Sequence, residues 1–337
     1  MCGRKFKVVL LFVLVTVLAI GVFSGQAANA QPKYRFLYVS HMGPADPNSN
    51  WFTVGMKRFE ERYSDVSVEY LTPPSPTPRA QLQMLKTAIA MAPDGLIVSM
   101  TAPEMFDATL RDAIKKGIPV VAFNIADPRP EDERIPYLTY VGGDEYLTGY
   151  RLGKRYLELR GKPTKVAVFQ FNPAHVGLEA RAKGMKDAMK EVGVLTEKVA
   201  LSPDAGESMS VMTSYLTANP EVDMVFAVTT YGEPWTVSVL KKLGKENEVD
   251  IIGVDASPTS LEGIKRGIIV AAQSQGFYLQ AYLPLTILYM YSRYGLSPAA
   301  DVLTGPIVID KTNVDKFIEM VKRIFGEETY NKLVAWR

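Results

Sequence analysis

Short apolar segments alternate with longer amphipathic segments along the chain from residue 33 onward. The short segments are rich in β-branched and aromatic residues, which is typical of buried strands. They predict strands at residues 34–40, 66–71, 95–100, 118–124, 165–171, 194–201, 224–229 and 251–255. The amphipathic segments predict helices at about residues 52–63, 79–91, 104–116, 178–192, 207–218 and 234–244. Apolar strands that alternate with helices indicate parallel sheets covered by helices on both faces.

The two halves of this pattern share their spacing. Strands in corresponding positions begin 131 residues apart (34 and 165), 129 apart (95 and 224) and 133 apart (118 and 251). This agreement indicates two lobes of one α/β type, related by duplication. In a parallel sheet, the loops that follow the strands leave from their carboxyl ends, where α/β folds bind ligands.

The N-terminal segment has the order of a secretory signal. Basic residues near the start are followed by an apolar run at residues 8–23 and by the small-residue triplet Ala28-Asn29-Ala30. The run of 16 residues is shorter than the roughly 20 that span a bilayer, so we favour cleavage after Ala30 over an uncleaved anchor. Removal of a signal peptide at residues 1–30 also removes Cys2, the single cysteine. We therefore expect a soluble protein in the periplasm or another extracytoplasmic compartment.

Composition and motifs exclude several classes of protein. Lys and Arg number 38 and Asp and Glu number 36, so there is no basic excess that would bind nucleic acid. One cysteine and two histidines give no basis for a zinc or other metal site. The sequence lacks a phosphate-binding loop, a dinucleotide-binding glycine motif, a nucleophile elbow and a zinc-protease motif. We expect a protein without cofactor or metal that is not an enzyme.

Polar and aromatic residues gather where the predicted strands end. Asp, Asn, Gln and Arg side chains each present two donors or acceptors in a plane, which suits neighbouring hydroxyls on a ring. Flat aromatic side chains suit the C–H faces of such a ring. The pattern therefore indicates a site for a neutral polyol between two lobes. The residues considered are His41, Asp46, Asn50, Trp51, Phe52, Asn124, Asp127, His175, Arg181, Tyr231, Trp235, Asp255 and Gln275.

Structural roles are the alternative for each of these residues. Asn50 and Asp255 could cap helices. Trp51 and Phe52 could pack at the edge of a core. Arg181 could pair with Glu179 or Asp187 at the surface. If Arg181 instead binds ligand, we expect Arg181→Ala to leave the fold largely intact but to weaken binding.

At these residues the chain resembles the type I periplasmic sugar-binding proteins, the family of ribose-, galactose-, xylose- and inositol-type binding components of ABC importers. The resemblance covers nearly all of the chain after the predicted signal peptide and rests on the order of several short motifs. These are the strand at 36–40, the turn Asn50-Trp51-Phe52, the segment 94–99, the segment 117–121 that leads to Asn124, the helix segment 181–185, the turn Gly253-Val254-Asp255 and the segment 275–278.

The resemblance implies an architecture and a set of site residues. It implies two doubly wound lobes joined by a multi-strand hinge, with an N-terminal lobe at residues 33–140 plus 277–304 and a C-terminal lobe at residues 141–276 plus 305–337. The implied ligand-binding residues are Asn50, Trp51, Phe52, Asn124, Arg181, Asp255 and Gln275, with His41, Asp46, Asp127, His175, Tyr231 and Trp235 as weaker candidates.

The implied function is that of an exported solute-binding protein, which captures a monosaccharide or cyclitol between its lobes and delivers it to the membrane permease of an ABC importer. A sensor that presents its ligand to a chemotaxis or signalling receptor is one alternative, and an exported α/β enzyme acting on sugars is another. A sugar-responsive repressor of the same fold is disfavoured, because the predicted signal peptide occupies the place of its DNA-binding domain. Departures from the family pattern at Trp51, Asn124 and Thr229 leave a cyclitol, a xylose-like sugar and a furanone-type signal molecule open as ligands.

Overall fold

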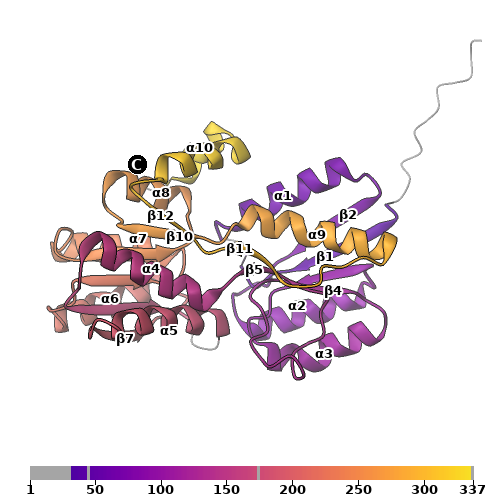
Figure 1. The fold of residues 1–337 in the computed structure, drawn as a ribbon, viewed down its shortest axis with the longest axis horizontal. Coiled ribbons are helices and arrows are strands. Elements are labelled where there is room, and N and C mark those ends of the chain that lie inside the picture. The colour runs from indigo at the N-terminus through magenta and orange to yellow at the C-terminus, as the bar shows by residue number, and fades with distance from the viewer. Residues whose placement is uncertain (1–31, 44–45, 173–174, 335–337) are drawn as a thin grey trace, which may run out of the picture.

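The computed structural model describes residues 32–43, 46–172 and 175–334. The signal peptide predicted for residues 1–30 lies outside these ranges. Two α/β lobes lie side by side, each built around its own six-stranded sheet (Figure 1).

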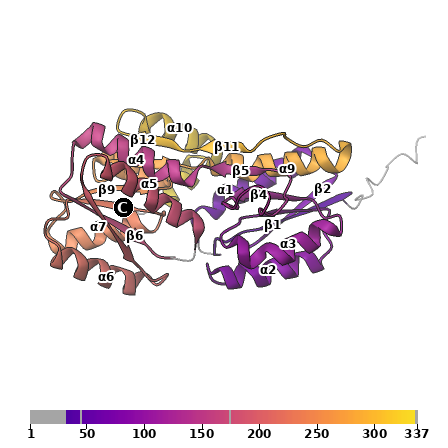
Figure 2. The ribbon, with the colours of Figure 1, turned by 60° about the horizontal axis from the view of Figure 1, so that its bottom comes forward.

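The first lobe contains a fully parallel sheet in the order β11-β5-β4-β3-β1-β2. Its strands are β1 (Tyr34–Val39), β2 (Val66–Leu71), β3 (Gly95–Val98), β4 (Val120–Asn124), β5 (Tyr140–Gly143) and β11 (Val302–Gly305). Helices α1 (Ser49–Arg62) and α9 (Phe277–Tyr294) cover one face, and α2 (Pro78–Ala90) and α3 (Pro103–Lys115) cover the other (Figures 1 and 2). Along β1, Phe36 and Tyr38 pack toward one layer and Leu37 and Val39 toward the other, so the strand is a continuous apolar run.

The second lobe repeats this plan with the order β12-β10-β9-β8-β6-β7. Its strands are β6 (Lys165–Gln170), β7 (Leu195–Ala200), β8 (Met224–Ala227), β9 (Asp250–Val254), β10 (Ala271–Ser274) and β12 (Ile307–Asp310), of which β12 is antiparallel to β10. Its helices are α4 (Glu145–Arg160), α5 (Val176–Lys190), α6 (Ala205–Ala218), α7 (Gly232–Leu243), α8 (Pro258–Arg266), α10 (Val314–Phe325) and α11 (Glu327–Leu333). Helices α4 and α5 pack on one face of the sheet, and α6 and α7 on the other. The predicted fold class is confirmed.

The chain passes from one lobe to the other at three places: between β5 and α4, between β10 and α9, and between β11 and β12. Each lobe is therefore assembled from separate chain segments, as a hinged two-lobe protein requires. The predicted lobe boundaries at 140/141 and 304/305 fall inside β5 and β11, and both of these strands pair within the first sheet.

Helices α4 and α5 approach each other closely because glycines face each other across the contact. A Cβ atom on Gly149 would collide with the backbone carbonyl of Arg181, and one on Gly184 with that of Tyr146. The backbones touch where side chains would otherwise keep them apart. This contact holds the first turn of α4 next to the middle of α5.

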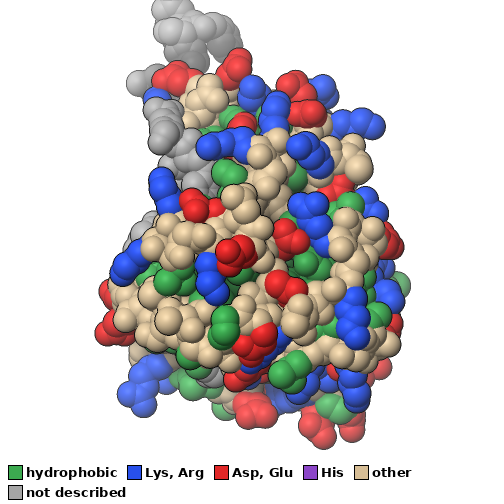
Figure 3. Space-filling model, turned by 90° about the vertical axis from the view of Figure 1, so that its left-hand side faces the viewer, with side chains coloured by type: hydrophobic (Ala, Val, Ile, Leu, Met, Phe, Trp, Pro, Cys, Tyr) green, Lys and Arg blue, Asp and Glu red, His purple; other side chains and the backbone are tan. Residues whose placement is uncertain are grey.

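No helix in the described part of the chain is long and apolar enough to cross a membrane. On the end of the second lobe, basic and acidic side chains are interspersed rather than gathered into a field of one sign (Figure 3). Such a mixed surface offers that face no broad electrostatic attraction for nucleic acid.

Candidate functional site

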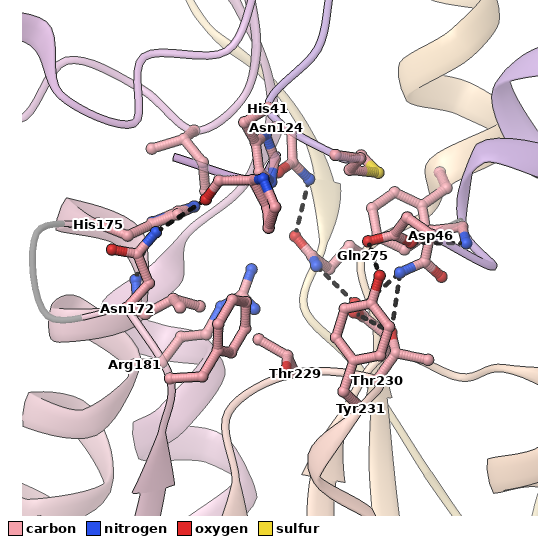
Figure 4. Close-up of a pocket in the computed structure, with 18 residues that line it drawn as sticks. His41, Asp46, Asn124, Asn172, His175, Arg181, Thr229, Thr230, Tyr231 and Gln275 are labelled. Atoms are coloured by element: carbon pink, nitrogen blue, oxygen red, sulfur yellow. Dashed lines mark hydrogen bonds between the residues drawn. The ribbon is translucent and has the colours of Figure 1, made fainter. Parts of the chain in front are cut away.

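A cavity lies between the lobes, where the carboxyl ends of the two sheets face each other (Figure 4). Clefts in this position are typical small-molecule sites in α/β proteins. It is lined by His41, Met42, Asp46, Asn48, Pro76, Asn124, Ile125, Phe171, Asn172, His175, Leu178, Arg181, Thr229, Thr230, Tyr231, Asp255, Gln275 and Phe277. Of the residues predicted from the sequence, the structure brings together His41, Asp46, Asn124, His175, Arg181, Tyr231, Asp255 and Gln275.

Equivalent positions in the two lobes carry Asn124 and Asp255, at the carboxyl ends of β4 and β9. Both have left-handed backbones, with φ of 61° and 83°. Asn and Asp tolerate this conformation better than other residues with side chains, and it turns the chain sharply at the cavity wall. The Gln275 side chain links them: its Oε1 accepts a hydrogen bond from Asn124 Nδ2 (3.1 Å), and its Nε2 donates to Asp255 Oδ1 (2.6 Å; Figure 4).

The Asp255 carboxylate is also bound from both lobes. Thr230 Oγ1, of its own lobe, donates to Oδ2 at 2.6 Å, and Asn48 Nδ2, of the first lobe, donates to the same oxygen at 3.2 Å. The Asn48 amide also donates to Thr230 Oγ1 at 2.8 Å. Hydrogen bonds to a carboxylate are stronger than those between neutral groups, so these contacts hold the Asp255 carboxylate in one orientation.

Arg181 supplies the positive charge of the cavity. Only 3% of its surface is exposed. Its Nε donates to the buried carboxylate of Glu145 at the start of α4, and its Nη1 donates to the Val228 carbonyl at 2.9 Å. Burial alone would lower the pKa of Arg181, but the adjacent Glu145 carboxylate raises it above its usual value. The expected surface position of Arg181 is wrong, because its side chain is half of a buried ion pair.

Two histidines face each other from opposite lobes. The rings of His41, after β1, and His175, before α5, meet edge to face with centroids 5.1 Å apart. His41 Nδ1 is 2.9 Å from Ser99 Oγ, and His175 Nδ1 accepts from the Leu178 amide at 3.4 Å at the start of α5. Burial, reinforced by the positive charge of Arg181, lowers the pKa of His41 to about 3.

The side of the cavity opposite the histidines contains Asp46 and Tyr231. The Tyr231 hydroxyl donates to Asp46 Oδ2 at 3.0 Å, across the lobes, and the backbone N–H of Asn48 donates to Oδ1 at 2.8 Å. Burial raises the pKa of Asp46 to about 6, and the Asp255 charge adds to the rise while these hydrogen bonds limit it. Trp235 stacks on the outer side of Tyr231, with centroids 5.8 Å apart, and does not line the cavity.

The turn 50–52, predicted from the sequence to bind ligand, lies outside the cavity. Helix α1 begins at Ser49, three residues earlier than predicted, so all three residues belong to the helix. Asn50 is exposed and donates to the Pro47 carbonyl at 3.0 Å. Trp51 packs on Phe325 with centroids 4.5 Å apart, and Phe52 is fully buried in the first-lobe core.

The predicted candidate Asp127 also lies outside the cavity. Its carboxylate accepts from Arg129 (2.6 Å from Nη2 to Oδ2) and from the Ile135 amide at 2.9 Å. Although burial opposes it, these hydrogen bonds lower the pKa of Asp127. The residue ties down the 127–135 loop, a structural role that the sequence spacing did not distinguish from ligand binding.

Sequence reasoning did not select Asn48, Thr230 and Glu145, which complete the site. Asn48 and Thr230 occupy the same post-strand loops as Asp46 and Tyr231, so their position was a usable signal. Glu145 is the first residue of α4, a helix that the sequence pattern did not predict. Its role depends on the close α4–α5 contact, whose signal in the sequence is a set of helical glycines that includes Gly149 and Gly184.

Residues 32–43, 46–172 and 175–334 contain no group of three or more His, Cys, Asp or Glu side chains that could hold a metal ion. The polar groups of the cavity are bonded mainly to one another. The chemistry they offer is recognition: planar amides, a carboxylate and a guanidinium, all held in place.

A family model described as a periplasmic binding protein domain matches residues 39–295. The chain belongs to the periplasmic binding protein family. Its members are binding proteins rather than enzymes, which agrees with the predicted class. The match runs through both lobes and through most of the residues that line the cavity.

Relatives of this periplasmic binding protein include the xylose/arabinose-binding protein XylF of Sulfolobus acidocaldarius, 28% identical over 236 residues, which cover 67% of this chain and 57% of that protein. The chain thus spans less than two thirds of that relative. A periplasmic sugar-binding protein of an ABC sugar transporter from Legionella pneumophila is 26% identical, with a TM-score of 0.75 over 81% of this chain and 99% of that one. A carbohydrate transporter structure from Acidothermus cellulolyticus, in complex with myo-inositol, shares the fold at 23% identity, with a TM-score of 0.78 over 87% and 99% of the two chains.

Proposed function

We propose that this chain is the solute-binding component of an ABC importer, located outside the cytoplasmic membrane, and that it captures a monosaccharide or cyclitol between its lobes. The names of its relatives support a sugar as the cargo: one is a xylose/arabinose-binding protein and one a periplasmic sugar-binding protein. The permease of the importer is the partner that receives the sugar.

The observation that carries the proposal is the orientation of the polar groups in the cavity. Asn124, Asp255 and Gln275 form one chain of hydrogen bonds along the wall, and Arg181 is held by Glu145. These bonds fix the positions of the groups in the closed form, so binding there costs little additional ordering. Planar amides, carboxylate and guanidinium match pairs of neighbouring hydroxyls on a ring.

The charges in the cavity favour a neutral ligand over an anion. The positive charge of Arg181 is compensated by Glu145, whereas Asp255 has no cationic partner among its hydrogen bonds. Asp46 adds a second negative charge above pH of about 6. An anionic sugar would meet a wall of its own sign, and like charges that are desolvated together repel strongly.

Capture follows from the three connections between the lobes. A ligand that touches both walls binds the closed form better than the open form, so it shifts the population toward closure. Closure removes the ligand hydroxyls from water and leaves them hydrogen-bonded to acidic groups of the cavity such as Asp255. Opening at the permease would release the sugar.

The test is a thermal-shift screen of the chain from Gln31 onward, the form left by cleavage after Ala30. The screen pairs neutral sugars with acids of the same skeleton, for example D-xylose with D-xylonate, and includes L-arabinose and myo-inositol. A ligand at a hundred times its Kd adds about 2.7 kcal/mol to the free energy of unfolding. We expect a neutral monosaccharide or cyclitol to stabilise the protein and its acid to have no effect.

Two variants test whether the ligand binds in this cavity. Asp255→Asn should weaken binding about 10- to 100-fold, since hydrogen bonds to a charged group contribute about 1.5–3 kcal/mol. Asn50→Ala is the matched control, because Asn50 was predicted from the sequence but lies outside the cavity. The proposal fails if no carbohydrate binds, if the bound sugar is chemically converted, or if both variants weaken binding equally.

A further inference from the structure

The whole chain contains two histidines, and both lie in one contact between the lobes. His41 comes from the loop after β1 of the first lobe, and His175 from the residue before α5 of the second. Figure 4 shows the two side chains approaching from opposite sides of the upper part of the cavity. In this closed arrangement His175 is buried and His41 is partly buried, and separation of the lobes would expose both further to water.

The surroundings of the two rings suit neutral imidazoles. His41 Nδ1 lies next to Ser99 Oγ, which in turn accepts from the neutral Gln81 amide at 2.9 Å. His175 Nδ1 accepts from the Leu178 amide, a bond that needs an unprotonated nitrogen. A proton on either ring would therefore cost a hydrogen bond or add a buried charge.

The charged groups near the pair also oppose a proton. The nearest cation is Arg181 on α5, and its field acts on both rings. Glu145 on α4 is engaged with Arg181, and Asp46 and Asp255 line the same cavity but are bonded to Tyr231, Asn48, Thr230 and Gln275. No carboxylate in the described part of the chain is hydrogen-bonded to either ring.

We propose that His41 and His175 form a proton-sensitive contact that permits lobe closure only while both rings are neutral, so that mild acid opens the protein. Direct bonds between the lobes, such as Asn48 with Thr230 and Tyr231 with Asp46, stabilise the closed form. Protonation of either ring acts against these bonds. The proposal concerns the lobes themselves and does not depend on which solute is bound.

The direction follows from linkage between protonation and closure. In the closed form burial lowers the pKa of His41 to about 3 and that of His175 well below its usual value, whereas exposed rings in the open form titrate near 6.5. Closure is therefore fully favoured above pH of about 6.5 and weakens as the pH falls from there. Asp46 acts in the opposite sense, because its pKa of about 6 in the closed form favours closure as the pH falls toward its ordinary value.

The two histidines together outweigh the single aspartate. With ordinary values in the open form, the equilibrium constant for closure should fall on the order of fifty-fold between pH 7 and pH 5. Without the Asp46 contribution the fall would be several-fold larger.

The experiment follows both rings and the size of the ligand-free chain from Gln31 onward, prepared without a histidine tag, between pH 7.5 and 4.5. The Cε1–H groups of the two histidines give two NMR signals, and small-angle X-ray scattering gives the radius of gyration. We expect both signals to titrate together, at a midpoint below 6.5, over the pH range in which the radius of gyration increases. Two rings that titrate near 6.5 at constant size would overturn the proposal.

Variants separate the histidines from other acid effects. In the double variant His41→Gln with His175→Gln the radius of gyration should no longer increase between pH 7 and 5, because only the opposing Asp46 contribution remains. Asp46→Asn should instead make the acid expansion steeper. An acid expansion that persists in the double variant overturns the proposal, and if that variant does not fold, the wild-type titration decides alone. No sugar is needed at any point, so the result is independent of the proposed function.

Discussion

The two walls of the cavity are built on the same backbone plan but from different chemistry. The first-lobe wall is mainly neutral, and so is the network that supports it behind His41: His41 contacts Ser99, Ser99 contacts Gln81, and the Gln81 Oε1 accepts from Thr101 Oγ1 at 2.6 Å. The second-lobe wall is charged, with the Arg181–Glu145 ion pair and the Asp255 carboxylate. Asp46, in the first lobe, is the exception and lies near the Tyr231 side.

This difference distributes two tasks between the lobes. A network of neutral groups costs little to desolvate and keeps its form over a wide pH range, so it serves as a fixed template. Buried charges are expensive unless every one is paired, so the second-lobe wall is sensitive to the loss of any member. The first lobe should therefore tolerate change better, while the second should control which charge the cavity accepts.

The largest expected effect is that of Arg181→Ala, which tests the charged wall directly. The substitution leaves the Glu145 carboxyl, only 9% exposed, without its partner. Removal of one member of a buried ion pair costs about 3–5 kcal/mol in the free energy of unfolding. Urea denaturation measures this loss.

The matched control for that prediction is Arg181→Met combined with Glu145→Gln, which removes both charges. It should recover much of the lost free energy of unfolding, because no unpaired charge remains. If Arg181→Ala alone is as stable as the wild type, the ion pair is not a stabilising element and the contrast between the walls does not hold.

A smaller effect is expected from a change at one of the two strand-end residues, Asn124. In Asn124→Asp, the new carboxylate would face the Oε1 atoms of Gln275 and Gln280, which now accept from the Asn124 amide at 3.1 and 3.0 Å. Rotation of the Gln275 amide would relieve that repulsion but turn its oxygen toward Asp255. We expect a loss of about 1.5–3 kcal/mol in sugar-binding free energy, measured by calorimetry.

The exchange of both residues, Asn124→Asp with Asp255→Asn, sharpens this prediction. A rotated Gln275 amide then satisfies both neighbours, so the double variant should bind better than Asn124→Asp alone. Additive losses in the double-variant cycle would mean that Gln275 does not couple the two positions.

The smallest expected effect belongs to the neutral wall. Gln81→Leu keeps a buried side chain of similar size but leaves the Ser99 carbonyl and the Thr101 hydroxyl without the bonds they now make with Gln81. We expect a loss of about 1–2 kcal/mol in the free energy of unfolding, from urea denaturation. A loss as large as that of Arg181→Ala would reverse the comparison of the two walls.

The repeated strand–helix pattern was readable from the sequence because most strands are buried on both faces. β1, β4 and β6 are near-continuous apolar runs, and the structure places them within one or two residues of the predicted bounds. β5 and β10 gave no such signal. Their sequences, Tyr-Val-Gly-Gly and Ala-Ala-Gln-Ser, contain little β-branched surface and are specified by pairing with neighbouring strands.

The site was partly readable for a different reason. Strand ends such as Asn124 and Asp255 meet at one edge of each sheet, so topology alone places them at the cavity. The direction of a side chain on the following helix depends on the residue at which the helix begins, and an error of three residues in α1 moved Asn50 and Phe52 from the expected site. The burial of Arg181 depends on a contact between helices that strand and helix patterns do not encode.

Gly149 and Gly184 set the distance between α4 and α5, and so determine where the guanidinium of Arg181 stands relative to Glu145. Neither glycine lines the cavity. A methyl group on either would push the helices apart and move the Arg181 charge within the cavity, although the methyl group itself would lie outside it. To reproduce this position of Arg181 in another two-lobed protein, one would therefore have to transfer the two helical glycines as well as the residues that line the cavity.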